Sequence, residues 1–217
     1  MPDFQHLLWF IAAGWLLNLT PGPDVLYIVS NALRQGARAG VVAGLGITTG
    51  CFVHIGAAAV GVSALLAASA TAFTLLKWLG AGYLLWVGVR MLFSGGTLNV
   101  PIPAGAQASS LPVRWRSVFL GGFWTNVLNP KVALFFLAFV PQFIAPDADN
   151  KALAFVMLGV LFNLNAIPVN VGWAVLAAWT ARRVGVLQRG LNWLERVAGA
   201  LFIGFGLKLA LTDNPPS

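Results

Sequence analysis

The chain has 217 residues, of which 59% are hydrophobic and 9% charged, and its formal net charge at pH 7 is +7. A soluble domain carries about 25% charged residues, so this composition excludes the soluble globular and disordered classes and indicates an integral membrane protein. The polar stretches between the apolar segments alternate in charge along the chain. Apart from Lys131, nine basic residues lie in or beside the first, third and fifth of these stretches, and three lie at the opposite ends of the segments. This is the positive-inside pattern, and it argues against nucleic-acid binding. The nine are Arg34, Arg38, Arg90, Arg114, Arg116, Arg182, Arg183, Arg189 and Arg196, and the three are Lys77, Lys151 and Lys208.

The first apolar segment extends from about residue 6 to residue 30 and is interrupted by the run Thr20-Pro21-Gly22-Pro23-Asp24. Proline removes a backbone donor, and freed backbone groups are tolerated in hydrocarbon only where protein or a water-filled cavity surrounds them. We therefore expect a polar site at this break, with Pro21, Gly22 and Pro23 as the helix-breaking backbone.

Two further segments complete the first half. Residues 40–67 form the second segment, and glycines recur around its start, which would let a neighbouring helix approach closely and would suit a homodimer. Residues 69–74 give a turn signal, and residues 75–93 form the third segment. The stretch 94–111 is rich in Gly, Pro, Ser and Ala without periodicity. We expect a cytoplasmic linker over 94–115 between a first unit, 1–93, and a second unit, 116–217.

The second half has the same organisation. Its first segment, about 118–144, is interrupted by Asn129-Pro130-Lys131, and segments at 152–179 and 191–211 follow. Six segments have the length of membrane spans, and five spans with a re-entrant second gap remain an alternative. Since the Arg-rich gaps are the first, third and fifth, they should face the cytoplasm, and six spans then put both termini outside.

A weak internal repeat relates the two breaks. The paired positions are Gly14 with Gly122, Asn18 with Asn126, and Pro23-Asp24-Val25 with Pro130-Lys131-Val132. Three spans per half is an odd number, so the second half must enter the membrane in the opposite orientation. The sequence thus predicts an all-α membrane protein of six transmembrane helices in two inverted three-helix repeats. Its first and fourth helices are broken, as in secondary transporters.

Asp24 and Lys131 are the two ionisable residues at the breaks. A charge at the bilayer midplane costs roughly 2.5–3.5 kcal/mol on insertion scales, so each needs a partner. Asp24 could hold a substrate ammonium or carry a coupling proton, or it could be a structural N-cap or the partner of Lys131. Lys131 could pair with Asp24, receive a substrate carboxylate, or form a salt bridge that only fixes helix packing.

Other polar residues lie within the apolar segments. Thr20, Asn126 and Asn129 flank the breaks and can hydrogen-bond freed backbone groups or ligand atoms. Asn163 and Asn165 could line a pathway on the fifth segment. His54 in the second segment could relay protons, or it could bond a backbone carbonyl. These three are expected as pathway candidates.

The sequence gives no sign of a cofactor or of catalysis. Two histidines and one cysteine lie far apart without metal-ligand spacing, so we expect no metal site. There is no Walker-type phosphate loop and no Ser-His-Asp arrangement. We therefore expect a protein that is not an enzyme and that binds no cofactor.

The motifs together resemble the lysine-exporter (LysE) superfamily, in particular its homoserine/threonine-exporter branch (RhtB). The resemblance covers nearly the whole chain and is carried by the run 20–24, the glycines leading to Gly50 and His54, the stretch 77–88, and the run 121–131 followed by Pro141-Gln142-Phe143. It implies proton-driven efflux of amino acids or close derivatives from the cytoplasm, across the inner membrane of a bacterium. A passive channel for small zwitterions, or a membrane assembly protein without transport activity, remain the alternatives.

Overall fold

In the computed structural model, residues 4–68, 70–93, 113–144, 148, 150–180 and 184–211 are described, and this part of the chain is helical without strands. The first half contains α1 (Phe4–Leu19), α2 (Pro23–Gln35), α3 (Ala37–Ala68) and α4 (Ala70–Phe93). The second half contains α5 (Trp115–Val127), α6 (Pro130–Leu134), the π-helical η1 (Phe135–Phe139), the 3₁₀-helical η2 (Val140–Phe143), α7 (Lys151–Trp179) and α8 (Val184–Leu211). The expected all-α class is confirmed.

The two helix breaks lie where the prolines predict them. α1 ends at Leu19, and α2 restarts at Pro23, whose missing N–H costs nothing at the first position of a helix. α5 ends at Val127, and α6 starts at Pro130 after Asn129, whose side chain accepts a hydrogen bond from the Lys131 amide at 3.1 Å. The stretch Pro130–Phe143 bends away from α5 by 47°. Each half therefore contains one discontinuous helix.

Two expected boundaries change. The turn predicted over 69–74 is wrong, because α4 is already helical from Ala70. Alanine, the best helix former, occupies two of the first three positions of α4, and threonine is tolerated there. Most of the expected linker, residues 94–112, lies outside the described residues, and α5 begins at Trp115.

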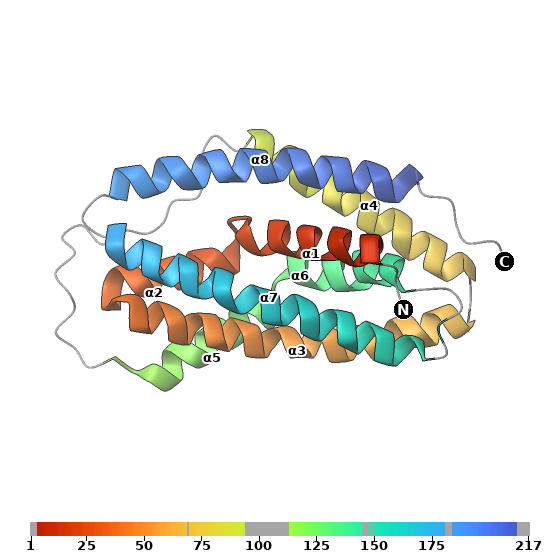
Figure 1. Cartoon of the computed structure of the whole chain (residues 1–217), viewed down its shortest axis with the longest axis horizontal. Coiled ribbons are helices and arrows are strands. Elements are labelled where there is room, and N and C mark those ends of the chain that lie inside the picture. Colours follow the sequence, from red (N-terminus) through yellow and green to blue (C-terminus); the bar gives the residue numbers. More distant parts are fainter. Residues whose placement is uncertain are drawn as a thin grey trace.

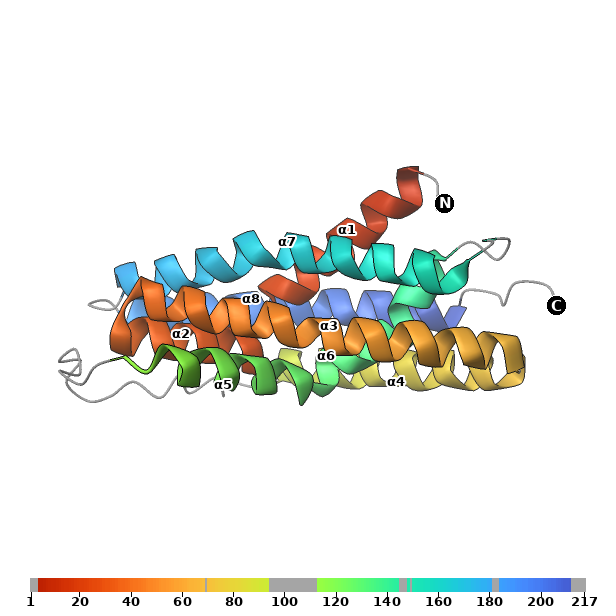
Figure 2. The same ribbon diagram turned by 90° about the horizontal axis from the view of Figure 1, so that it is seen from below.

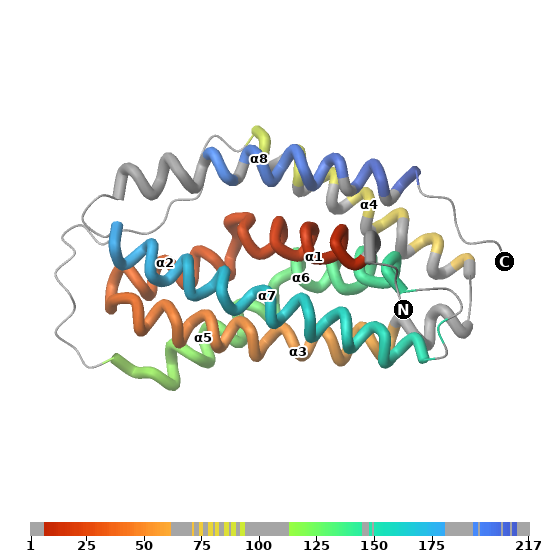
Figure 3. Tube along the Cα trace, in the orientation of Figure 1, coloured from red at the N-terminus to blue at the C-terminus, as the bar shows by residue number. Residues whose placement is uncertain are grey.

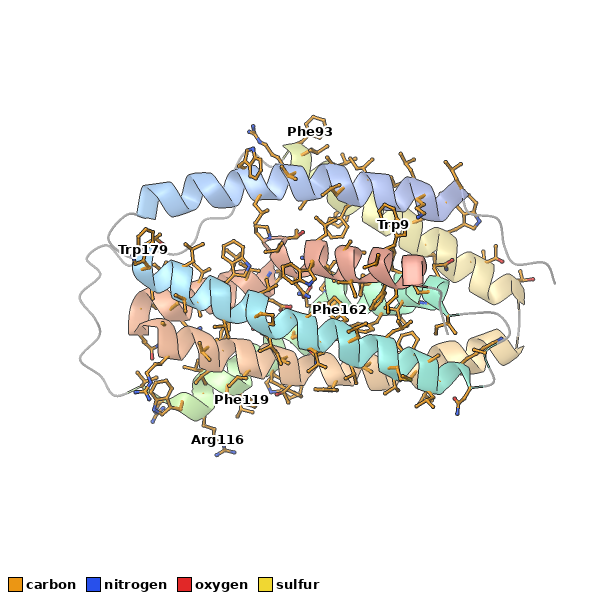
Figure 4. All side chains as sticks on the ribbon, in the orientation of Figure 1. Trp9, Phe93, Arg116, Phe119, Phe162 and Trp179 are labelled. Carbon is orange, nitrogen blue, oxygen red and sulfur yellow. The ribbon has the colours of Figure 1, made fainter. Side chains whose placement is uncertain are left out.

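Among the described residues, two helices meet both the length and the hydropathy of a membrane span. Ala37–Gly61 of α3 and α7 are each long and apolar enough to cross a bilayer, and the bent pair from Trp115 to Phe143 is a third candidate if it forms one span. Large apolar side chains such as Trp9, Phe93 and Trp179 are exposed, and Phe93 points away from the bundle (Figure 4), as expected of a surface in contact with lipid. The described residues thus give two or three candidate spans.

The helices are arranged around α3. It packs along α5 on one side and α7 on another, and α2 contacts both α3 and α7, while α4 and α8 form a separate pair (Figures 1 and 2). Close approach of α3 and α5 depends on glycine, because a Cβ on Gly50 would lie 2.6 Å from the Phe123 carbonyl oxygen. This contact brings the end of α5, and so the second break, against the middle of α3.

The buried apolar residues form two clusters. One surrounds Phe136, Phe155 and Phe162, and the other surrounds Ile28 and Ala174. Leu17 and Val132, next to the two breaks, belong to the first cluster, and Val25 belongs to the second. The Cα trace places both breaks away from the two ends of the bundle (Figure 3). The polar residues of the breaks are therefore enclosed by protein on both sides.

Candidate functional site

Both breaks open onto one cavity of about 30 Å³. It is lined from α1, α2, α3, α5, α6, α7 and the two breaks, with Phe162 of α7 (Figure 4) among its apolar walls. Its polar lining residues are Asn18, Thr20, Asp24, Thr48, Asn126, Asn129, Lys131, Asn163 and Asn170. Among the described residues, the polar groups predicted at the two breaks therefore line one cavity.

Asp24 lies in the first turn of α2. Helix amides and the macrodipole favour a negative charge at this position. One carboxylate oxygen, Oδ2, accepts a hydrogen bond from the Asn126 amide at 2.8 Å, so the first half is joined to the end of α5. The other oxygen, Oδ1, is buried without a hydrogen-bond partner among the described residues.

Lys131 contacts the end of the first half-helix rather than a carboxylate. Its ammonium donates to the carbonyls of Leu17 at 2.9 Å and Thr20 at 3.0 Å. A helix end leaves such carbonyls unpaired, and a positive charge there is favourable. Among the described residues, no direct ion pair joins Lys131 to Asp24, although both line the cavity. The direct pairing considered from the sequence is thus not formed in this structure.

His54 makes the corresponding contact in the opposite direction. Its Nε2 lies 2.9 Å from the carbonyl oxygen of Asn126 in the last turn of α5, and its ring stacks on Phe136 at a centroid distance of 6.5 Å. Because a carbonyl only accepts, Nε2 must carry the proton. His54 is not among the cavity-lining residues. Each half-helix end at a break is therefore bonded by a basic side chain of the other half.

Thr20 and Asn129 line the cavity but satisfy the backbone at the breaks. The Thr20 hydroxyl donates to the Leu16 carbonyl, and Asn129 caps α6 through the Lys131 amide. Gly22 lines the cavity beside Lys131, whose Nζ would lie 3.6 Å from a Cβ at that position. Pro21, Pro23 and Pro130 do not line it.

α7 supplies two asparagines to the cavity. Asn163 donates to the backbone carbonyl of Thr48 at 2.9 Å, and Asn170 lies 3.4 Å from the Thr48 hydroxyl. Asn165, in contrast, lies outside the cavity. Its amide donates to the Leu161 carbonyl, and its Oδ1 accepts from the Trp15 indole nitrogen at 3.4 Å. Of the two α7 candidates, the structure brings Asn163 to the site and not Asn165.

Sequence reasoning did not select Thr48 and Asn170 as site residues. Asn170 follows Asn163 by seven residues, a spacing that puts both on one helix face, so this signal was available. Thr48 carries no comparable signal, because its hydroxyl bonds the Gly44 carbonyl at 2.9 Å as threonines in apolar helices commonly do.

Several polar atoms of the lining are buried without a partner. These are Asn18 Nδ2, Asp24 Oδ1, Asn126 Oδ1 and Asn163 Oδ1. Buried polar atoms are almost always hydrogen-bonded, and exceptions in a cavity indicate a place for a ligand or water. No group of three or more His, Cys, Asp or Glu residues gathers for a metal ion within the described ranges. The arrangement can therefore bind a small polar molecule.

Comparisons with known proteins agree with this description. The family model described as "LysE type translocator" matches residues 15–213. An uncharacterized membrane protein of Vibrio cholerae is 31% identical over 212 residues, covering 96% of this chain and 98% of its own length. A homoserine/homoserine lactone efflux protein of Salmonella typhimurium is 30% identical, covering 95% of this chain and 97% of its own length.

A leucine efflux protein of an Enterobacter strain is also similar, with 28% identity over 201 residues and 93% of each chain covered. No solved structure matches the chain. Because the family model spans nearly the whole sequence, the chain belongs to the LysE type translocators, a family of membrane transport proteins.

Proposed function

We propose that the protein is a secondary transporter that exports small neutral amino acids or close derivatives from the cytoplasm, coupled to the proton gradient, by alternating access around the cavity at the two breaks. The observation that carries the proposal is the cavity itself. It lies where two discontinuous helices meet and contains Asp24, Lys131 and buried polar atoms without partners. Transporter binding sites are typically formed by such broken helices.

The substrate class is supported by what the named cargoes of the relatives have in common. Two relatives are named for the efflux of homoserine and homoserine lactone, or of leucine. All three molecules carry a primary ammonium next to a carbonyl carbon, whereas the lactone has no free carboxylate. The shared ammonium is the group for a buried carboxylate to recognise, so Asp24 binds the substrate amine or, in its absence, a proton.

Lys131 has a different role in this proposal. Its contacts with the Leu17 and Thr20 carbonyls hold the first break closed around the cavity. One of its three N–H groups is left over by these two bonds, and it can meet the carboxylate of those substrates that have one. This division suits a site that accepts both an amino acid and its lactone.

The inverted three-helix repeat is supported by how the helices pair. In the proposed repeat, α1 and α2 correspond to the stretch from α5 to η2, α3 corresponds to α7, and α4 corresponds to α8. The corresponding helices α3 and α7 pack on each other, and so do α4 and α8. Helices that lie next to a two-fold axis in the membrane plane pack on their own equivalents in this way. The Arg-bearing start of α5 and the end of α2 lie at one end of the bundle, opposite the start of α7 (Figure 1). A cytoplasmic Arg-rich end in the inner membrane, with both termini outside, follows from that distribution.

Alternating access is favoured over a passive channel by the size of the cavity. A space of about 30 Å³ on this measure holds a water molecule or two. An amino acid needs several times that space, so the helices must move for each molecule transported. A passive channel would instead leave a continuous path through the bundle.

The test is flux through the purified protein in proteoliposomes loaded with homoserine, threonine or leucine under an imposed pH gradient. The proposal predicts saturable flux that depends on the gradient and that falls at least about tenfold in Asp24→Asn and in Lys131→Gln. Asn165→Ala, which removes a polar side chain of α7 outside the cavity, is the matched control and should transport normally. Non-saturable flux insensitive to the gradient would identify a channel, and wild-type rates in both charge variants would refute the assigned site.

A further inference from the structure

The cavity contains an excess of hydrogen-bond acceptors, contributed by three different helices. Asp24 of α2, Asn126 of α5 and Asn163 of α7 line it, and each has one buried oxygen, Oδ1, without a partner among the described residues. Asn126 and Asn163 are 3% and 2% exposed, so water outside the protein does not satisfy these oxygens. Three unpaired acceptors around one small space favour an occupant that donates hydrogen bonds.

The orientation of both amides is set by chemistry. The Asn126 amide faces Asp24 Oδ2 at 2.8 Å, and the Asn163 amide faces the Thr48 carbonyl at 2.9 Å. Both of these partners only accept when the carboxylate is ionised, so each amide must present its NH₂ group to them. Flipping either side chain would place two acceptors together. While Asp24 is ionised, as it is when it binds an ammonium, the free Oδ1 atoms are therefore acceptors.

Most of the donors that line the cavity are already used, although one N–H of Lys131 is left over. The Lys131 ammonium donates to Leu17 and Thr20, the Thr20 hydroxyl to Leu16, and the Thr48 hydroxyl to Gly44. Asn18 Nδ2 is one lining donor without a partner. Among the described residues Asp24 has no direct ion pair, so a ligand that brings three donors and a positive charge on one atom would satisfy all three oxygens at once, whereas a single water molecule donates only two hydrogen bonds and no charge.

We infer that Asp24, Asn126 and Asn163 form a subsite for a primary ammonium group, in which one N–H of the ligand is donated to each Oδ1. This inference rests on the proposed export of amino acids and specifies which chemical group the site selects. A –NH₃⁺ head has three donors and is about the size of a water molecule, so it matches the three acceptors and the volume of the cavity. An N-methylated amine has two donors and places a methyl group against a polar atom.

The test is equilibrium binding to the purified wild-type protein, with radiolabelled homoserine, threonine and leucine as probes. Three competitors are used against homoserine. Homoserine lactone lacks the carboxylate, N-methylhomoserine lacks one N–H, and 4-hydroxybutyrate lacks the whole ammonium. The N-methyl derivatives of threonine and leucine are used against the other two probes. We expect the lactone to compete within about tenfold of homoserine and the other two to compete at least about tenfold more weakly, the equivalent of one charged hydrogen bond. Equal competition by the N-methyl derivative would overturn the subsite.

Asn163→Ala locates the effect. It should weaken binding of the primary amine about tenfold and leave the weak affinity for 4-hydroxybutyrate unchanged, so that discrimination between the two falls. A merely structural role would lower both affinities together. The matched control is Asn165→Ala, two residues along α7 and outside the cavity, which should keep full discrimination.

The outcomes separate the subsite from the proposed function. Binding and flux of an amino acid without ammonium selectivity would overturn the subsite alone. If none of the three amino acids binds or is transported, both proposals are overturned. Binding that requires sodium, compared at equal ionic strength with potassium, would assign the three oxygens to a metal ion instead and would also overturn the subsite.

Discussion

At the scale of single residues, two basic side chains join the halves through backbone carbonyls rather than through carboxylates. Lys131 bonds the end of α1, and His54 bonds the end of α5. The sequence identifies both residues, because ionisable groups within apolar segments are few. It does not identify their partners, since carbonyls freed by a break carry no side-chain signature. This is why a direct Asp24–Lys131 pair was an equally reasonable expectation.

Lys131 and Asp24 should nevertheless be energetically coupled across the cavity. Removing the ammonium in Lys131→Met leaves two buried carbonyls unpaired and the Asp24 carboxylate uncompensated, which should lower the free energy of unfolding by about 3–5 kcal/mol. In a protein that already carries Asp24→Asn, Lys131→Met should lower the free energy of unfolding by less, and the difference between the two effects should be roughly 0.5–3 kcal/mol. Thermal or denaturant unfolding of the four proteins in detergent measures the cycle. Strictly additive effects would show that the two charges do not interact.

At the scale of elements, the sequence predicts the breaks well because proline acts locally. α2 starts at Pro23 and α6 starts at Pro130, because proline favours the first position of a helix whatever the tertiary contacts around it. The expected turn at 69–74 fails for the opposite reason, since its Ala and Thr residues break no helix and tertiary packing decides. The face that α7 turns to the cavity also depends on packing. The sequence gives no reason to prefer Asn163 over Asn165, yet Asn163 bonds the Thr48 carbonyl beside the cavity whereas Asn165 bonds Leu161 within its own helix.

The contact between α3 and α5 gives a prediction for helix packing. A Cβ on Gly46 would meet the Phe119 backbone, whereas one on Gly56, further along the same helix, would meet nothing within 4 Å. Gly46→Ala should therefore force the helices apart and lower the free energy of unfolding by about 1–3 kcal/mol. Gly56→Ala, the matched control, should be neutral or stabilising by up to about 1 kcal/mol. Equal melting temperatures for the two variants would contradict the close approach of α3 and α5.

At the scale of the whole molecule, the polar atoms of both halves meet in a space too small for the proposed cargo. The repeat in the sequence predicts that two breaks exist and that they correspond. It cannot predict that α3 lies between α5 and α7, or that Thr48 therefore joins the site, because helix adjacency arises from packing over long sequence separations. Nor can it give the cavity volume, which depends on every side chain around it.

The central claim is that the substrate occupies this cavity, and the chain contains its own reporter. Cys51, its single cysteine, is buried on α3 in the cavity wall. Alkylation by N-ethylmaleimide therefore requires the cavity to open. The measurement is the alkylation rate in membranes with and without homoserine, threonine or leucine, in the wild type and in Asp24→Asn, with Cys51→Ala as the unlabelled control. We predict that at least one of these amino acids slows alkylation several-fold in the wild type and has no effect in Asp24→Asn. Alkylation unaffected by any of them in the wild type, or protection undiminished in Asp24→Asn, would contradict the account.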